Sequence, residues 1–177
     1  MPNKSVGRPQ YDGIMQLISC EDFHGSPVYI GKLLENERLA EALSYWDSLP
    51  KTNGLPHRRD FDPLAIPRLL PDVCLVDALA DDRFVYRLAG TRLEQLYQRP
   101  FKGRTPQEIF PDSADRVIGA YRLVRDTRQI FYRRGVLKRI EPRRETISYS
   151  LVVMPFSRDG TAVSQLLGAH DHNSEDR

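Results

Sequence analysis

The chain has 177 residues, and its 26 basic and 24 acidic side chains nearly cancel to a formal net charge of +2. A content of 40% hydrophobic and 28% charged residues is typical of a globular domain and excludes a disordered or fibrous chain. Two cysteines are too few for a disulfide scaffold, and no apolar run approaches the roughly 20 residues of a transmembrane helix. The residues before Cys20 are polar and interrupted by Pro and Gly, unlike an export signal. We therefore expect a cytoplasmic protein with no membrane contact.

The N-terminal part of the sequence predicts an extension followed by a helix. Residues 1–31 mix Gly, Pro and polar side chains without a long hydrophobic period. Over residues 32–49, an apolar stripe at spacings of 4, 3 and 3 predicts an amphipathic helix. Such a stripe packs on the body of the domain or on a second copy of the chain. A homodimer is expected, with this helix as its contact and Leu39, Leu43 and Trp46 as the contact residues.

A β-hairpin is predicted after a proline-rich connector. Its strands are 73–79 and 84–89, and two aspartates between them supply the turn. On the second strand Phe84, Tyr86 and Leu88 lie at every other position, so these three are predicted to face the core.

Helix starts are predicted from capping signals. An Asp or Thr at the N-cap accepts hydrogen bonds from backbone N–H groups of the first turn, and a Glu three residues later completes a capping box. A longer helix is expected to begin after Asp112 or Ser113 and to place Val117, Tyr121 and Val124 on one face. The other capping signals are Asp62 before Pro63, Thr91 with Glu94, and Thr105 with Glu108.

The C-terminal part reads as three strands, at 129–138, 147–154 and 161–169, with an Asp-Gly turn before the last one. The element order is therefore β-β-α-α-α-β-β-β. This order predicts an α+β fold with a five-stranded antiparallel sheet, helices on one face, and a flanking N-terminal helix. We expect one domain over 32–170 and a polar tail over 171–177.

This order resembles a PAS domain, most closely a bacterial stand-alone subfamily common in alphaproteobacteria and formerly described as a domain of unknown function. The Asp-Phe-Asp-Pro and Arg-Leu-Ala-Gly-Thr segments are quite specific together, and the resemblance covers about residues 37–170. The residues that carry it are Tyr45, Trp46 and Leu49, with the segments 55–63, 66–71, 84–91, 101–105, 155–160 and 166–169.

The resemblance implies a module that senses a small molecule, dimerises and passes a signal to a partner in trans, and it implies no enzymatic activity. Haem-binding PAS domains usually supply a histidine from the long helix, and that helix has none here. Flavin photoreceptors of this family need a cysteine on the helices, and Cys20 and Cys74 lie elsewhere. Neither cofactor is therefore supported, and the expected ligand is an unidentified small molecule.

The predicted ligand pocket lies between the sheet and the helices. Tyrosines are informative there because a buried hydroxyl needs a hydrogen-bond partner, which can be a polar ligand or the backbone. A packed core without a ligand is the alternative. The candidate pocket residues are Tyr86, Leu88, Leu96, Tyr97, Phe110, Tyr121, Val124, Tyr149 and Leu151.

The small net charge conceals a basic segment. Residues 122–144 carry 9 basic and 2 acidic side chains, whereas residues 1–50 carry 4 and 7. The segment predicts either a solvated face paired with acidic residues or a surface for nucleic acid, a nucleotide or an acidic protein. Nucleic acid is the less favoured partner. The candidate stripe consists of Arg122, Arg125, Arg128, Arg133 and Arg134.

Catalytic and metal sites are not predicted. No G-x-S-x-G, H-E-x-x-H or Walker sequence occurs. His170-Asp171-His172 near the C-terminus lacks the further ligands of a metal site, so its side chains are expected to face solvent. Cys74 is expected to be a small buried hydrophobe. Two alternatives to a PAS sensor remain open, an Arg-rich nucleic-acid or nucleotide adaptor and a small enzyme with its active site in the cavity.

Overall fold

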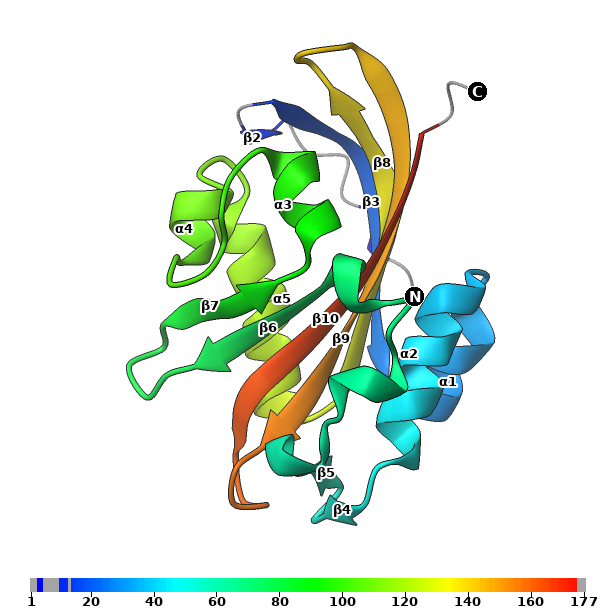
Figure 1. The fold of residues 1–177 in the computed structure, drawn as a ribbon, viewed down its shortest axis with the longest axis vertical. Helices are drawn as coiled ribbons and strands as arrows, with labels where there is room; N and C mark the ends of the chain where they lie inside the picture. The colour runs from blue at the N-terminus through cyan, green and yellow to red at the C-terminus, as the bar shows by residue number, and fades with distance from the viewer. Residues whose placement is uncertain (1–2, 5–9, 13, 175–177) are drawn as a thin grey trace.

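Six long strands form an antiparallel sheet in the computed structural model, which describes residues 3–4, 10–12 and 14–174 (Figure 1). Two short strands, β1 and β2, pair with the outer edge of β3. The strand order is β1-β3-β8-β9-β10-β6-β7. The strands are β1 (Asn3–Lys4), β2 (Gln10–Asp12), β3 (Met15–Gly25), β6 (Val73–Ala78), β7 (Phe84–Ala89), β8 (Ile130–Arg139), β9 (Glu145–Ser157) and β10 (Val163–Ser174).

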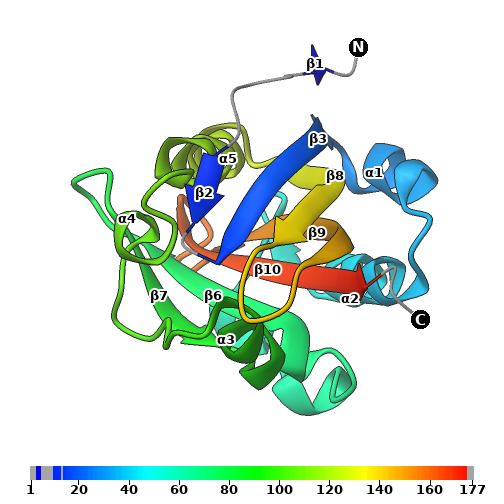
Figure 2. The same cartoon turned by 90° about the horizontal axis from the view of Figure 1, so that it is seen from above.

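A helical layer covers each face of this sheet, as Figure 2 shows. We call the face under α3, α4 and α5 the inner face and the face under α1 and α2 the outer face. Because side chains alternate along a strand, Val153 packs in the inner core and its neighbour Val152 in the outer core. The helices are α1 (Pro27–Leu33), α2 (Glu37–Ser48), α3 (Thr91–Tyr97), α4 (Pro106–Ile109) and α5 (Ala114–Thr127).

The connector between α2 and β6 runs along the outer face. It begins with a small two-stranded sheet, β4 (Lys51–Thr52) and β5 (Leu55–Pro56). Three 3-10 turns follow, η1 (Arg58–Asp60), η2 (Pro63–Ala65) and η3 (Leu70–Asp72). Asp62 caps η2 through a hydrogen bond from the Leu64 N–H to its carboxylate at 2.9 Å, as predicted.

The α+β class and the element order from β6 to β10 are confirmed. Strand period, turn residues and caps were sufficient signals here, because each is local in the sequence. The capping box of Thr105 and Glu108 is present at the start of α4. Gly160 ends the β9–β10 turn at φ +77, a conformation that favours glycine.

The sheet has more strands than the five expected, because β3 lies within the segment predicted as an extension. The same segment contains most of α1. β3 escaped notice for two physical reasons. A register shift between Leu17 and Ser19 breaks its alternation. Its pairing with β8 also uses ion pairs, Asp22 with Arg133 and Glu21 with Arg134, in place of an apolar period.

The segment predicted as one helix over 32–49 contains the end of α1 and the whole of α2. Ser26 and Asn36 are the N-caps of α1 and α2, and each side-chain oxygen accepts a bond from a backbone N–H three residues later. Leu34 has extended backbone angles and ends α1, so the continuous period of the sequence spans a break.

Two further boundaries differ from the expectation. Gly90, not Thr91, is the N-cap of α3, and Glu94 instead accepts a hydrogen bond from the Phe101 N–H at 2.9 Å. A side chain at Gly90 would lie 2.2 Å from the Pro71 carbonyl oxygen, so only glycine fits there. β10 continues through Ser174 opposite β9, so the first residues of the predicted tail belong to the sheet.

In the part of the chain that the structure describes, no helix is both long and apolar enough to cross a membrane.

Candidate functional site

A cavity of about 80 Å³ lies between the inner face of the sheet and α3, α4 and α5. Its wall is mostly aromatic and aliphatic, with a few polar side chains from β8, β10 and α5. The lining residues are Leu17, Cys74, Tyr86, Leu93, Tyr97, Phe101, Phe110, Ser113, Arg116, Val117, Ala120, Tyr121, Phe131, Arg133, Leu137, Tyr149, Leu151, Val153 and His170.

Two tyrosines form a polar contact within this apolar wall. The hydroxyls of Tyr86, on β7, and Tyr121, on α5, lie 2.9 Å apart, and both residues are buried. Burial raises the pKa of both phenols well above the usual value. Both hydroxyls are therefore protonated at neutral pH, and a pair of hydroxyls retains capacity for a further hydrogen bond to a small polar molecule.

Arg116 and Arg133 separate the cavity from a groove of about 420 Å³ between α5 and β3. Arg133 is only 5% exposed and donates two hydrogen bonds to Asp22, at 2.6 and 2.8 Å. Burial lowers the pKa of Arg133, but the hydrogen bonds to Asp22 and the electrostatic interactions with Tyr149, Asp22 and Cys20 together raise it overall. The Arg116 guanidinium lies 2.9 Å from the Cys20 sulfur. Both arginines line the cavity and the groove, so they form the wall between the two.

Histidine rings continue the cavity wall along β10. His170 and His172 point to the same face and stack in parallel, with ring centroids 5.9 Å apart. The His170 Nε2 lies 3.6 Å from the sulfur of Cys74, and burial raises the pKa of that thiol to about 12. The His172 ring packs against Tyr97 and Tyr149. Burial lowers the pKa of His170 to about 4 and that of His172 to about 3.

We expect the folded protein to lose stability as the pH falls from about 6.5 toward 4. In this window the unfolded chain protonates its histidines at the usual pKa near 6.5, whereas His170 and His172 stay neutral in the fold. The unfolded state then binds more protons, so each histidine lowers the unfolding free energy by at most about 1.4 kcal/mol per pH unit. Both residues keep partial contact with solvent, which reduces this value. Urea unfolding across the pH range measures it.

The matched controls for this pH dependence are His172→Phe and His24→Gln. His172→Phe removes one of the two groups and should flatten the slope. His24 is exposed on β3, so His24→Gln should leave the slope unchanged. An equal slope in all three proteins would contradict the assignment to the β10 pair.

The cavity contains most of the residues that the sequence suggested for it. Leu88 does not line it, because Arg87 is an extra residue in a register shift of β7 and turns Leu88 to the outer face, where it is 40% exposed. Val124 is fully buried in the inner core, and Leu96 packs in a separate small cluster. The predicted residues that do line the cavity are Tyr86, Tyr97, Phe110, Tyr121, Tyr149 and Leu151.

The sequence does not predict the polar part of the wall. It places Arg133 in a surface stripe and predicts that the His170 side chain faces solvent. One signal was present in the sequence, since Arg133 lies two positions after Phe131 on the same strand and therefore shares its face, which packs in the core. His170 required knowing that β10 extends past residue 169.

The five arginines of the predicted stripe do not form one free basic surface. Arg133 and Arg134 are neighbours on a strand and face opposite sides of the sheet. Arg128 ends α5 and donates to the carbonyls of Asn53 and Thr161. The remaining four pair with carboxylates: Arg122 and Arg125 with Asp82, Arg133 with Asp22, and Arg134 with Glu21 and Glu35.

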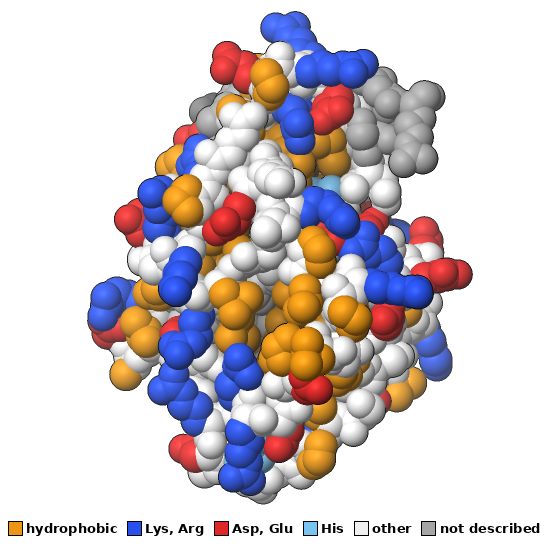
Figure 3. Space-filling view, viewed as in Figure 1, with side chains coloured by type: hydrophobic (Ala, Val, Ile, Leu, Met, Phe, Trp, Pro, Cys, Tyr) orange, Lys and Arg blue, Asp and Glu red, His pale blue; other side chains and the backbone are white. Residues whose placement is uncertain are grey.

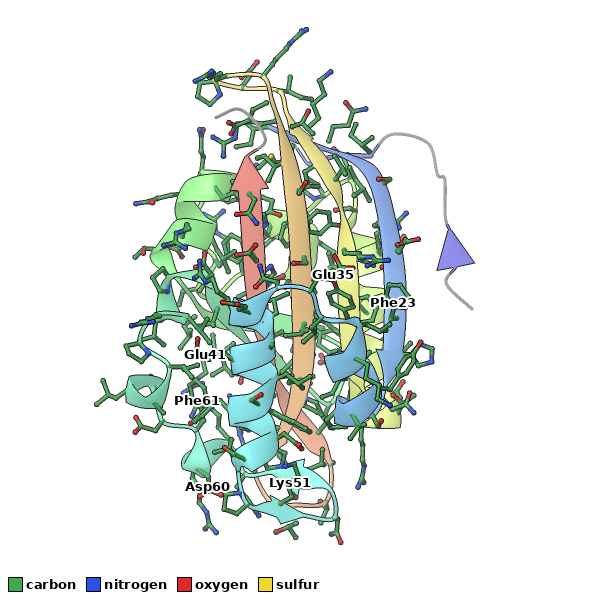
Figure 4. All side chains as sticks on the ribbon, turned by 90° about the vertical axis from the view of Figure 1, so that its right-hand side faces the viewer. Phe23, Glu35, Glu41, Lys51, Asp60 and Phe61 are labelled. Carbon is green, nitrogen blue, oxygen red and sulfur yellow. The ribbon has the colours of Figure 1, made fainter. Side chains whose placement is uncertain are left out.

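The residues predicted for a dimer contact are packed within the chain. Leu39, Leu43 and Trp46 are 0%, 5% and 2% exposed in the outer core. The Trp46 Nε1–H donates to the Pro155 carbonyl at 2.8 Å. Figure 4 shows α1 and α2 lying across the outer face of the sheet, with Phe61 beside α2. The apolar stripe of the helix is therefore covered by the chain's own sheet.

Potential metal ligands are not grouped within residues 14–174: no cluster of three or more His, Cys, Asp or Glu could hold an ion there. Contrary to the expectation of solvent-exposed side chains, His170 and His172 are half-buried in β10. Asp171 lies on the opposite face, where its carboxylate is 3.8 Å from Arg38.

The strand order, the helices on the inner face and the position of the cavity are now defined. Residues 34–170 match the family model of the PAS domain. The chain belongs to the PAS domain family. This family is one of sensory and signalling modules. No curated protein matches the chain. In this PAS domain, β3 and α1 precede the matched region, and so does Asp22, the carboxylate partner of Arg133.

Proposed function

We propose that this PAS domain is a sensor that binds a small polar molecule in the inner cavity and acts on a signalling protein in trans. The observation that carries the proposal is the group of polar side chains in an otherwise apolar wall: the Tyr86–Tyr121 hydroxyl pair, Arg116, Arg133 and His170. Ligand pockets have this composition, with a few placed polar groups that orient the ligand.

The size of the cavity supports a ligand of few atoms. Pockets for drug-sized ligands measure about 300–1,000 Å³, and this cavity measures about 80 Å³. A haem or flavin group would have to displace the aromatic side chains of α3, α4 and α5. The long helix α5 carries no histidine to ligate a haem iron. The residues present therefore do not fit either cofactor.

The protonation states favour binding over catalysis. Burial keeps the phenols of Tyr86 and Tyr121 protonated and His170 neutral at pH 7. With its pKa raised to about 12, the Cys74 thiol is not a nucleophile at that pH. These groups can donate and accept hydrogen bonds, but none is poised near pH 7 as a general base. The alternative of a nucleic-acid or nucleotide adaptor is less well supported, because the arginines of its stripe are paired.

The proposal is tested by filling the cavity. Ala120, on α5, is 6% exposed and lines it. We expect Ala120→Leu to fold and to lose the bound molecule, because the added side chain occupies the space. Native mass spectrometry of the purified protein detects a co-purifying ligand. Thermal shifts against small polar metabolites measure binding, since a ligand that binds only the folded state raises its stability.

The matched control is Ala65→Leu in η2, where the added side chain projects from an exposed position. It should bind the same ligand as the wild type. Equal binding by Ala120→Leu, or a wild-type protein with no bound mass and no thermal shift, would overturn the proposal.

A further inference from the structure

The β6–β7 end of the outer face carries an excess of positive charge that the fold does not neutralise. Asp77, on β6, is the carboxylate at its centre, and Gln165 donates to one of its oxygens at 2.5 Å. Arg87 and Arg158 lie 3.4 and 3.9 Å from this carboxylate. Arg58, in η1, interacts electrostatically with both Arg87 and Asp77. Three guanidinium groups thus share one carboxylate.

The charge on this cluster is unfavourable for Arg58. Burial lowers the pKa of Arg58, and the like charge of Arg87 lowers it further, more than the carboxylate of Asp77 raises it. By contrast, the five arginines of the predicted stripe, Arg122, Arg125, Arg128, Arg133 and Arg134, have carboxylate or carbonyl partners. Arg87 and Arg158 are 58% and 66% exposed, so their donors remain accessible to an added anion.

An exposed apolar residue lies beside the cluster. The register shift at Arg87 turns Leu88 to the outer face opposite Leu75, so Arg87 and Leu88 both point outward although they are adjacent. Leu88 is 40% exposed there. In Figure 3 hydrophobic side chains gather near the centre of this face, over β6, β7 and the connector, and Lys and Arg side chains lie beside them. Arginine next to an apolar centre is the composition of protein interfaces.

We propose that Arg58, Arg87, Arg158 and Leu88 form a docking surface for an acidic segment of a partner protein that also presents an apolar side chain. Carboxylates of that segment bind the guanidinium groups that Asp77 alone does not neutralise, and its apolar side chain covers Leu88. Guanidinium forks match carboxylates in paired hydrogen bonds. A nucleic acid would bind the guanidinium groups through its phosphates but would leave Leu88 uncovered. A protein segment with an apolar side chain is therefore the favoured partner.

Labelled synthetic peptides serve as the probe in a fluorescence anisotropy titration of the full chain. One peptide alternates Glu and Leu, a second has Ser in place of Leu, and a third has Lys in place of Glu. A single-stranded oligonucleotide of equal charge is the fourth ligand. We expect the Glu-Leu peptide to bind most tightly, with an affinity that falls as salt increases.

Variants assign the binding to this surface. We expect the double variant Arg87→Glu with Arg158→Glu to bind the Glu-Leu peptide with an affinity lower by about tenfold or more, because two attractive contacts become repulsive. Leu88→Ser should lower the affinity for the Glu-Leu peptide and leave the affinity for the Glu-Ser peptide unchanged. Circular dichroism and thermal midpoints check that each variant is folded. All three positions are substantially exposed, so little loss of stability is expected.

The chain offers matched controls far from the surface. Arg143→Glu with Arg144→Glu makes the same charge change in the β8–β9 connection, and Val28→Ser removes an apolar side chain that is 68% exposed on α1. Neither should alter peptide binding. The proposal is overturned if these controls weaken binding as much as the surface variants, or if the Glu-Ser peptide or the oligonucleotide binds as tightly as the Glu-Leu peptide. Failure of the Glu-Leu peptide to bind at millimolar concentration also overturns it.

Discussion

Asp72→Ala is expected to lower the free energy of unfolding by about 3 kcal/mol, because it breaks a buried ion pair from one side. Asp72 is 2% exposed in η3, and its carboxylate binds both Arg38 on α2 and Arg92 on α3, the latter at 2.5 Å. The variant leaves two guanidinium groups without this partner. Each is part-exposed, so water recovers some of the loss and the effect stays at the low end of the range for buried pairs. Urea unfolding at pH 7 measures it.

Two variants control this measurement. Asp72→Asn keeps the size of the side chain and removes its charge, so it should recover only part of the loss. Asp81→Ala removes the carboxylate of a pair with Arg83 in which both side chains are more than half exposed. Exposed pairs contribute at most about 1 kcal/mol. If the Asp72 and Asp81 variants lost equal stability, the assignment of a buried, bridging role to Asp72 would be wrong.

Asp72 lies where the two helical layers of the fold meet, so its ion pairs with Arg38 and Arg92 connect these layers. α2 covers the outer face of the sheet, and α3 lies on the inner face against the cavity. Their arginines meet on one carboxylate that also lies directly before β6. Asp171, on β10, adds a second carboxylate near Arg38 at 3.8 Å. Asp72 therefore links the two helical layers at the point where the chain enters the sheet.

Signals between residues close in the sequence predict the elements from β6 to β10. The N-terminal strand β3 instead depends on contacts with residues far away in the sequence. Asp62, the Thr105–Glu108 box and the Asp159–Gly160 turn act on residues within a few positions, so the sequence shows both partners of each interaction. β3 depends on a register with β8 more than a hundred residues away. Its carboxylates look like ordinary surface charges until Arg133 and Arg134 are placed opposite them.

The candidate site shows the same division. The aromatic residues of the cavity followed from strand and helix periods, and Tyr86 and Tyr121 were correctly placed on facing elements. Leu88 was misplaced because one extra residue in a strand reverses the face of every residue after it. No pattern in a single strand shows such a shift; it is visible only from the register with β6.

The charge distribution also changes meaning in three dimensions. The basic segment 122–144 suggested a binding surface, but its stripe arginines have partners from β3, the α1–α2 connection and the β6–β7 turn. Three guanidinium groups near the single carboxylate of Asp77 instead come from Arg58, Arg87 and Arg158, which are far apart in the sequence. Net charge along the chain therefore does not identify this cluster.

Trp46→Ala is expected to lower the free energy of unfolding by about 3–5 kcal/mol, the range for removing a large buried aromatic side chain. The Trp46 ring is 2% exposed in the outer core, and its Nε1–H donates to the Pro155 carbonyl on β9. Trp46→Phe keeps much of the apolar surface but leaves that carbonyl without its donor, so a smaller loss of about 1–3 kcal/mol is expected. Denaturant unfolding measures both variants.

The same variants distinguish packing within the chain from packing across a dimer. Because Leu39, Leu43 and Trp46 contact the chain's own sheet, the loss of stability in Trp46→Ala should be the same at low and high protein concentration. Tyr29→Ala, at a position 46% exposed on α1, is the control and should change stability by less than about 0.5 kcal/mol. A loss that grows with protein concentration would show that Trp46 stabilises an assembly of two chains and would contradict the intrachain packing of α2.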